Sequence, residues 1–175
     1  MKKLTLILLF ILLICYSAYA ATDTRAVTVT VPAIFSLELT GVETSVDFGS
    51  ADPGTSTPPF DKPNGIFEAT CRSNNGNTWY LKISNTQPFT LATDASVTIS
   101  NNNFKWYGVY TDGTGTLVKT SQSMSASAAT VYTASATEKV NTPNGTKIQL
   151  KFGLVIPTNV QAGTYNSTIV LTITE

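Results

Sequence analysis

Residues 148–157, with the sequence IQLKFGLVIP, decide the fold class of the chain. Up to Pro157, every second position of this stretch is apolar: Ile148, Leu150, Phe152, Leu154 and Ile156. A period of two residues is typical of a β-strand that buries one face. A second run of the same kind follows, with apolar residues at Tyr165, Ile169, Leu171 and Ile173. The sequence therefore predicts two long strands near its end.

The same alternation extends back through the chain and predicts further strands. Val27, Val29 and Val31 alternate with Thr, and the pattern resumes after Pro32 as far as Leu39. A proline has no N–H for a sheet ladder, so Pro32 fits an edge, a bulge or a crossing between sheets. Shorter runs predict strands at residues 46–48, 67–72, 79–83, 97–99, 104–110 and 117–118.

Two segments in the middle of the chain carry more specific predictions. Residues 67–72 and 79–83 flank the polar sequence NNGN at 74–77, which predicts a hairpin with Cys71 and Trp79 near one core. Residues 120–137 are rich in Ser, Thr and Ala and fit either a loop or a polar edge strand around Val131 and Tyr132. With no convincing helical stripe, the chain is expected to be all-β, an antiparallel β-sandwich of the immunoglobulin-like or jelly-roll type.

The first residues have the features of a secretory signal. Lys2 and Lys3 precede an apolar run over residues 4–15, and small residues stand on both sides of Tyr19. This predicts a cleaved signal peptide at residues 1–20 and a single β-sandwich domain at residues 21–175. The apolar run is too short to cross a bilayer. A lipoprotein signal using Cys15 is a minor alternative. The expected location is outside the cytoplasm: cell surface, periplasm or extracellular space.

The composition argues against several classes of function. The 175 residues are 42% hydrophobic and 13% charged, with 11 basic and 11 acidic side chains and no histidine. Cleavage removes two of the 11 basic residues, Lys2 and Lys3, so that 9 face 11 acidic ones. A nearly neutral domain is not suited to nucleic acid, nor to a membrane after signal cleavage. Cys71 would be the one remaining thiol, so no internal disulfide is expected.

Residues that usually catalyse reactions or bind metals are scarce. The sequence TDGTG at 111–115 is similar to a calcium loop only at Asp112-Gly113, and a hairpin turn explains it better. Cys71 alternates with Phe67 and Ala69 and is expected in the core. A carboxylate-dependent hydrolase would need a pair of acids, and no pattern pairs the acids near predicted strands: Glu38, Glu43, Asp47 and Glu68. We therefore expect no enzyme, no catalytic residue, no metal site and no cofactor, with a carboxylate-dependent hydrolase as the less favoured alternative.

Exposed tyrosines leave one binding function open. Sugar rings stack on aromatic side chains, and Tyr80, Tyr107 and Tyr110 are candidates for ligand binding. The same tyrosines also fit simple packing against neighbouring strands. A carbohydrate-binding module is therefore the alternative function.

Three short segments resemble known bacterial surface proteins. Trp79 and Leu81 are similar to the first Trp-x-Leu element of WxL domains, and residues 162–173, AGTYNSTIVLTI, resemble their second element. There, Leu171 and Ile173 stand where that family has Trp and Leu. Residues 46–54, VDFGSADPG, with the same ending, are similar to fimbrial subunits and spore-coat-U-type domains. The first resemblance implies attachment to the cell wall, and the second implies polymerisation by donating a strand to a neighbour.

These observations predict a non-enzymatic, exported structural or adhesive protein of the bacterial cell surface. Residues 22–30 alternate Val with Thr, and Val27, Val29 and Val31 form the candidate assembly strand, with Pro32 as a hinge. Pairing inside the same chain is the default for such a strand. The hypothesis is that it pairs with another subunit and builds linear assemblies. The expected partners are other surface proteins or the protein itself, and a cell-wall or glycan ligand.

Overall fold

A computed structural model describes residues 25–40, 45–56 and 67–175. The predicted signal peptide at residues 1–20 and Glu43 lie outside the described residues. By its internal contacts the chain divides into two units, Met1–Val31 and Pro32–Glu175. Within the described ranges, no helix combines the length and the apolar character needed to span a membrane.

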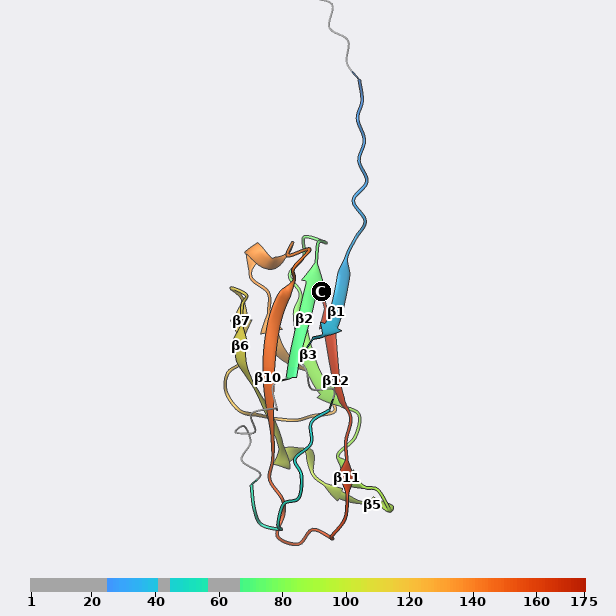
Figure 1. Cartoon of the computed structure of the whole chain (residues 1–175), viewed down its shortest axis with the longest axis vertical. Coiled ribbons are helices and arrows are strands. Elements are labelled where there is room, and N and C mark those ends of the chain that lie inside the picture. The colour runs from blue at the N-terminus through green and yellow to red at the C-terminus, as the bar shows by residue number, and fades with distance from the viewer. Residues whose placement is uncertain (1–24, 41–44, 57–66) are drawn as a thin grey trace, which may run out of the picture. The chain divides into compact units, whose positions relative to one another are not determined.

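The unit Pro32–Glu175 is all-β and antiparallel, which confirms the predicted fold class (Figure 1). Its strands are β1 (Phe35–Leu39), β2 (Phe67–Ser73), β3 (Tyr80–Asn85), β4 (Phe89–Leu91), β5 (Asp94–Ile99), β6 (Phe104–Thr111), β7 (Thr116–Leu117), β8 (Gln122–Ser123), β9 (Ala129–Thr133), β10 (Thr146–Leu154), β11 (Tyr165–Asn166) and β12 (Ile169–Thr174). Two short 3₁₀ turns, Asn101–Asn103 and Ala136–Glu138, join them.

The strands form three sheets. A five-stranded sheet has the order β1-β2-β10-β6-β8, a four-stranded sheet has the order β12-β3-β9-β7, and β11-β4-β5 form a small third sheet. The core lies between the two larger sheets, because inward-facing residues of both belong to one apolar cluster. Its largest fully buried side chains are Trp79, Trp106, Tyr132 and Phe104. The predicted alternation is visible in β10, where Ile148 and Leu150 are buried and Lys147 is exposed.

The order of six strands resembles that of an immunoglobulin sandwich, whereas β7, β8 and β9 have no counterpart in that order. In that fold, one sheet has the order A-B-E-D and the other contains C-F-G. In the five-stranded sheet, β1, β2, β10 and β6 take the places of A, B, E and D. In the four-stranded sheet, β3 and β12 take the places of C and F. Among the described strands, none occupies the G position beside β12. The four-stranded sheet therefore ends at β12.

The predicted hairpin at residues 67–83 is wrong. Strand β2 pairs with β1 and β10, whereas β3 pairs with β12 and β9, so the loop between them crosses from one sheet to the other. Cys71 and Trp79 nevertheless face the same core, and both are fully buried. Alternation fixes which face of a strand is apolar, but it does not fix which strand lies beside it.

Two further predictions are corrected. Val131 and Tyr132 lie in a strand, β9, which was one of the two predicted forms, but it is neither polar nor at an edge: β9 lies between β3 and β7, and both residues are fully buried. The phenol of Tyr132 tolerates burial because it has hydrogen-bond partners. Residues 27–31, expected as a half-buried strand, form no strand in this chain. Val27, Val29 and Val31 are 93%, 84% and 74% exposed.

Candidate functional site

The edges of the two large sheets leave an apolar row partly uncovered. Leu171 pairs with Ile83 and Ile173 with Leu81, so the side chains of β12 that face inward alternate with outward Val170, Thr172 and Thr174. In β1, Leu37 pairs with Cys71 and also faces the core. We call the inward-facing row of both edges the open seam; its members are Phe35, Leu37, Leu39, Ile169, Leu171 and Ile173.

The open seam is exposed where its neighbours are not. Leu81 and Ile83, directly opposite on β3, are almost fully buried. Ile169, Leu171 and Ile173 are only partly buried, and Leu39 on β1 is 55% exposed. A side chain that faces inward but remains accessible lacks a covering element on one side. The seam can therefore bury further apolar side chains.

The backbone at these edges is also available. Among the described strands, β12 pairs only with β3 and β1 only with β2. An edge strand of this kind presents a row of N–H and C=O groups that another strand can pair with. The arrangement can thus accept a strand by both backbone hydrogen bonds and apolar contact.

The two edges run in opposite directions and come within 8 Å of each other between Cα atoms. Asn75 and Asn77, in the loop after β2, donate hydrogen bonds of 2.8 and 3.1 Å to the carboxylate of Glu175. The same end of β2 pairs with the first residue of β1, since Phe35 lies opposite Ser73. The end of β12 therefore lies at the start of β1, as Figure 1 shows by the position of the C-terminus.

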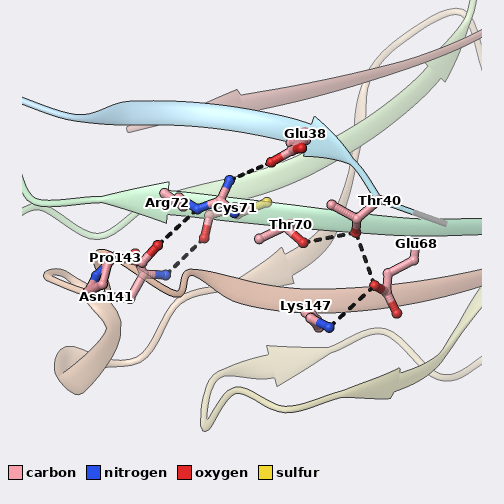
Figure 2. A network of polar contacts seen from close by, with 9 residues as sticks. All are labelled: Glu38, Thr40, Glu68, Thr70, Cys71, Arg72, Asn141, Pro143 and Lys147. Carbon is pink, nitrogen blue, oxygen red and sulfur yellow. Dashed lines mark hydrogen bonds and ion pairs between the residues drawn. The ribbon is translucent and has the colours of Figure 1, made fainter.

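Polar contacts on the outer face hold β1 against its neighbours (Figure 2). Arg72 forms an ion pair of 2.8 Å with Glu38 of β1 and also donates to the carbonyl of Pro143. Thr40, directly after β1, donates to Glu68 at 3.0 Å and lies 2.9 Å from the hydroxyl of Thr70. These contacts hold the edge strand β1 in place within the sheet.

A second group of polar contacts on this face is centred on Glu68. The amide of Gln149 donates to it at 2.8 Å, and Lys147 lies 3.8 Å away. The hydrogen bond from Gln149, with smaller effects from Thr40 and Lys147, lowers the pKa of Glu68 despite partial burial. Glu68 and Glu38 thus both have partners that join neighbouring strands.

Asn74 extends the β1–β2 ladder toward the N-terminus. Its side chain donates to the carbonyl of Pro32 at 2.8 Å and accepts from the N–H of Ile34 at 2.6 Å. Its own N–H donates to the carbonyl of Ile34 at 3.0 Å. Residues 32–34 are therefore held in line with β1 by one asparagine. No sequence pattern singled out Asn74, although an Asn directly after a strand commonly bonds to nearby backbone.

The three candidate tyrosines do not form one site. Tyr107 lies opposite Lys151 and Tyr110 opposite Gln149, so both face outward from the five-stranded sheet. Tyr110 is 50% exposed. Tyr80 faces outward from the other large sheet, with the ammonium of Lys82 5.9 Å from its ring centre. A single ligand could contact Tyr107 and Tyr110 together, but not Tyr80.

The remaining candidates for chemistry have structural surroundings. Cys71 is fully buried, and burial raises the pKa of its thiol to about 12. Asp47 accepts a hydrogen bond from the N–H of Gly49, and Asp112 accepts one from the N–H of Lys147. Within the described residues, no group of three or more Cys, Asp and Glu side chains could hold a metal ion.

A buried acid that the sequence reasoning missed lies at the opposite edge of the core. Glu138 accepts hydrogen bonds from the hydroxyls of Tyr132 and Thr146, at 2.7 and 3.0 Å, and from the N–H of Ser135 at 2.9 Å. Burial alone would raise the pKa of Glu138, but these donors together lower it. A sequence signal existed: Ser135-Ala-Thr-Glu138 has the spacing of a capping box. These hydrogen bonds join β9, β10 and the turn at Ala136–Glu138 within the core.

A pocket of about 790 Å³ opens near the small sheet. Its walls include apolar Phe48, Phe89 and Ile156 and the carboxylates of Asp47 and Asp52. Phe48 packs edge-to-face on Phe89 and Phe104, which ties the segment after residue 45 to the core. The pocket is thus formed by packing between a loop and the sandwich.

No protein-family model matches the chain, and no curated protein matches it.

Proposed function

We propose that the protein is a non-enzymatic structural or adhesive element of the bacterial cell surface, exported and assembled through β-strand pairing. The observation that carries the proposal is the open seam, with its accessible apolar row and unpaired backbone edge. The same chain contains a segment of matching character in Val27, Val29 and Val31, all highly exposed.

The segment and the seam match in period and chemistry. Valines at every second position of residues 27–31 fall on one face when the segment is extended. The seam has apolar residues at every second position of β12, over the same length. Full burial of a valine side chain contributes roughly 1.5 kcal/mol or more, so three of them give a substantial favourable free energy before backbone hydrogen bonds.

The test compares the size of assemblies formed by matched variants. The chain beginning at Ala21 is expected to form assemblies in size-exclusion chromatography with light scattering, and deletion of residues 22–30 is expected to leave only monomer. A variant with Val27→Asp and Val29→Asp places charge on the apolar face and should also be monomeric. Its control, Thr28→Asp with Thr30→Asp, adds the same charge to the opposite face and should still assemble. A monomer that the deletion leaves unchanged contradicts the proposal.

A carbohydrate-binding module remains the second candidate, because Tyr107 and Tyr110 share one outer face with Gln149 and Lys151. Such a face offers aromatic stacking next to hydrogen-bonding side chains. Binding on a glycan array that Tyr107→Ala abolishes and Tyr80→Ala leaves intact would favour this function. Absence of binding to any glycan would argue against it, and loss of binding only in the Tyr80 variant would assign the site to the other large sheet.

A further inference from the structure

The geometry points to Asn74 as the residue that directs the N-terminal segment to a second copy of the chain; this inference rests on the proposed function. A segment covalently joined to β1 has two possible acceptors. It can turn back and fill the seam of its own sandwich, or it can fill the seam of another copy. The hydrogen bonds of Asn74 decide between these outcomes.

Filling the chain's own seam requires a particular register. A segment that turns back onto β1 forms an antiparallel hairpin, in which directly opposite residues share a face. To place the valines beside the inward-facing residues of β1, Val31 must lie opposite Phe35, Val29 opposite Leu37 and Val27 opposite Leu39. In that register the hairpin loop consists of residues 32–34.

Residues 32–34 are the ones that Asn74 holds in line with β1. The carbonyl of Pro32 and both backbone groups of Ile34 are hydrogen-bonded to Asn74. Forming a loop there would break these three hydrogen bonds. Three-residue hairpin loops also favour a residue in the left-handed region, which the sequence Pro-Ala-Ile does not supply. Pro32, expected as a hinge, is therefore held in place by its carbonyl.

A turn placed before residue 32 would keep the hydrogen bonds of Asn74, but it would bring the valines opposite the wrong residues of β1. With residues 30 and 31 as a two-residue turn, Val29 lies opposite Pro32 and Val27 opposite Ile34. Phe35, Leu37 and Leu39 would then lie opposite Ala26, Thr24 and Thr22, so polar threonines would face most of the seam. A three-residue turn at 29–31 brings Arg25 and Asp23 to Phe35 and Leu37 instead. With Asn74 in place, the valines do not reach the chain's own seam.

A second copy has no such restriction. Its segment arrives without a covalent link to the accepting sandwich, so it can shift until its valines match Ile169, Leu171 and Ile173. It can also run antiparallel to β12, the direction that pairs slightly more strongly. Asn74 is thus a positioning residue: it keeps the donor segment from closing on itself and leaves the chain's own seam open for a neighbour.

The experiment uses the chain beginning at Ala21 with Asn74→Ala, which frees Pro32 and the N–H of Ile34. Asn77→Ala is the matched control, since Asn77 lies in the same loop and bonds to Glu175 instead. Light scattering gives the monomer fraction, and hydrogen exchange followed by mass spectrometry reports protection of the β1 amides. We expect Asn74→Ala to raise the monomer fraction about thirtyfold, the factor that corresponds to two hydrogen bonds of ordinary net strength. The β1 amides of that monomer should exchange slowly, because its own segment now pairs with β1.

Different results separate this inference from the proposed function. Equal monomer fractions in the wild type, Asn74→Ala and Asn77→Ala overturn the role of Asn74 but leave strand addition standing. So does an Asn74→Ala monomer whose β1 amides exchange as fast as in the chain lacking residues 22–30. A wild-type monomer whose β1 amides are protected by residues 22–30 overturns the choice of a second copy. A wild-type monomer that the deletion does not change overturns the proposed function and this inference together.

Discussion

Replacement of Glu138 by Gln tests whether the buried acid stabilises the fold as a carboxylate. The carboxylate accepts from Tyr132, Thr146 and the N–H of Ser135. A hydrogen bond to a charged group contributes about 1.5–3 kcal/mol and one between neutral groups about 0.5–1.5 kcal/mol. The amide of Gln is neutral, and its NH₂ group faces a donor. We therefore expect Glu138→Gln to lower the free energy of unfolding by roughly 2–4 kcal/mol.

The pH dependence gives this prediction a specific signature. The pKa of Glu138 is lowered in the folded protein relative to 4.5, the ordinary value. A group whose pKa is lowered on folding stabilises the protein above its unfolded pKa, and the effect is lost as the pH falls through the folded pKa. The difference between wild type and Glu138→Gln should be constant at neutral pH and shrink below pH 4.5.

Urea unfolding followed by tryptophan fluorescence measures the effect, because Trp79 lies in the core with its ring 5.5 Å from that of Tyr132. Protein concentration must be equal in all samples, since assembly would shift the apparent stability. Tyr132→Phe and the double variant complete a cycle, in which we expect a coupling energy of about 1 kcal/mol or more. A change below about 0.5 kcal/mol for Glu138→Gln, or a difference that stays the same from pH 7 to pH 3, would refute the reasoning.

Three further predictions concern the core and the seam. Leu171→Asp should abolish assembly in light scattering, whereas Thr172→Asp, on the outer face of the same strand, should not; equal effects would contradict the assigned faces. In urea unfolding, Trp79→Phe should lower the free energy of unfolding by about 1 kcal/mol more than Trp106→Phe does. The reason is that the indole N–H of Trp79 donates to the carbonyl of Glu138, while the buried N–H of Trp106 has no partner. A larger loss for Trp106→Phe would contradict this. Cys71 should react with a maleimide only on unfolding, since burial raises its pKa to about 12, and rapid labelling of folded protein would count against this.

The sequence predicted the strands well because alternation is a local property. In β10 and β12, each residue's face follows from its position in the run, so inward-facing Leu150 and Leu171 could be assigned without knowing the fold. The pairing partners could not be assigned in this way. The loop at residues 74–77 suits a hairpin or a crossing between sheets equally, and contacts with β1 and β10 decided the outcome.

For a related reason, the sequence predicted only one of the two parts of the candidate site. Val27, Val29 and Val31 could be singled out because they alternate with threonine. The seam could not, because Ile169, Leu171 and Ile173 have the same pattern as a fully covered strand. Their exposure arises from the absence of a described strand beyond β12, which is a property of sheet order. Asn74 was missed because its partners, Pro32 and Ile34, are distant in sequence. Glu138 was missed although its partners are close in sequence, because the capping-box spacing from Ser135 does not show that the acid is buried.

The two halves of the proposed assembly site explain each other physically. An open edge with an accessible apolar row is normally a liability, because it can pair with unrelated strands and aggregate. Proteins usually protect such edges with inward-pointing charges, prolines or bulges, yet none interrupts Ile169, Leu171 and Ile173. Three exposed valines are a liability of the same kind. If the segment covers the seam of a neighbour, the valines and the seam are buried in one step. Only the two chains at the ends of the assembly then keep an uncovered segment or an uncovered seam.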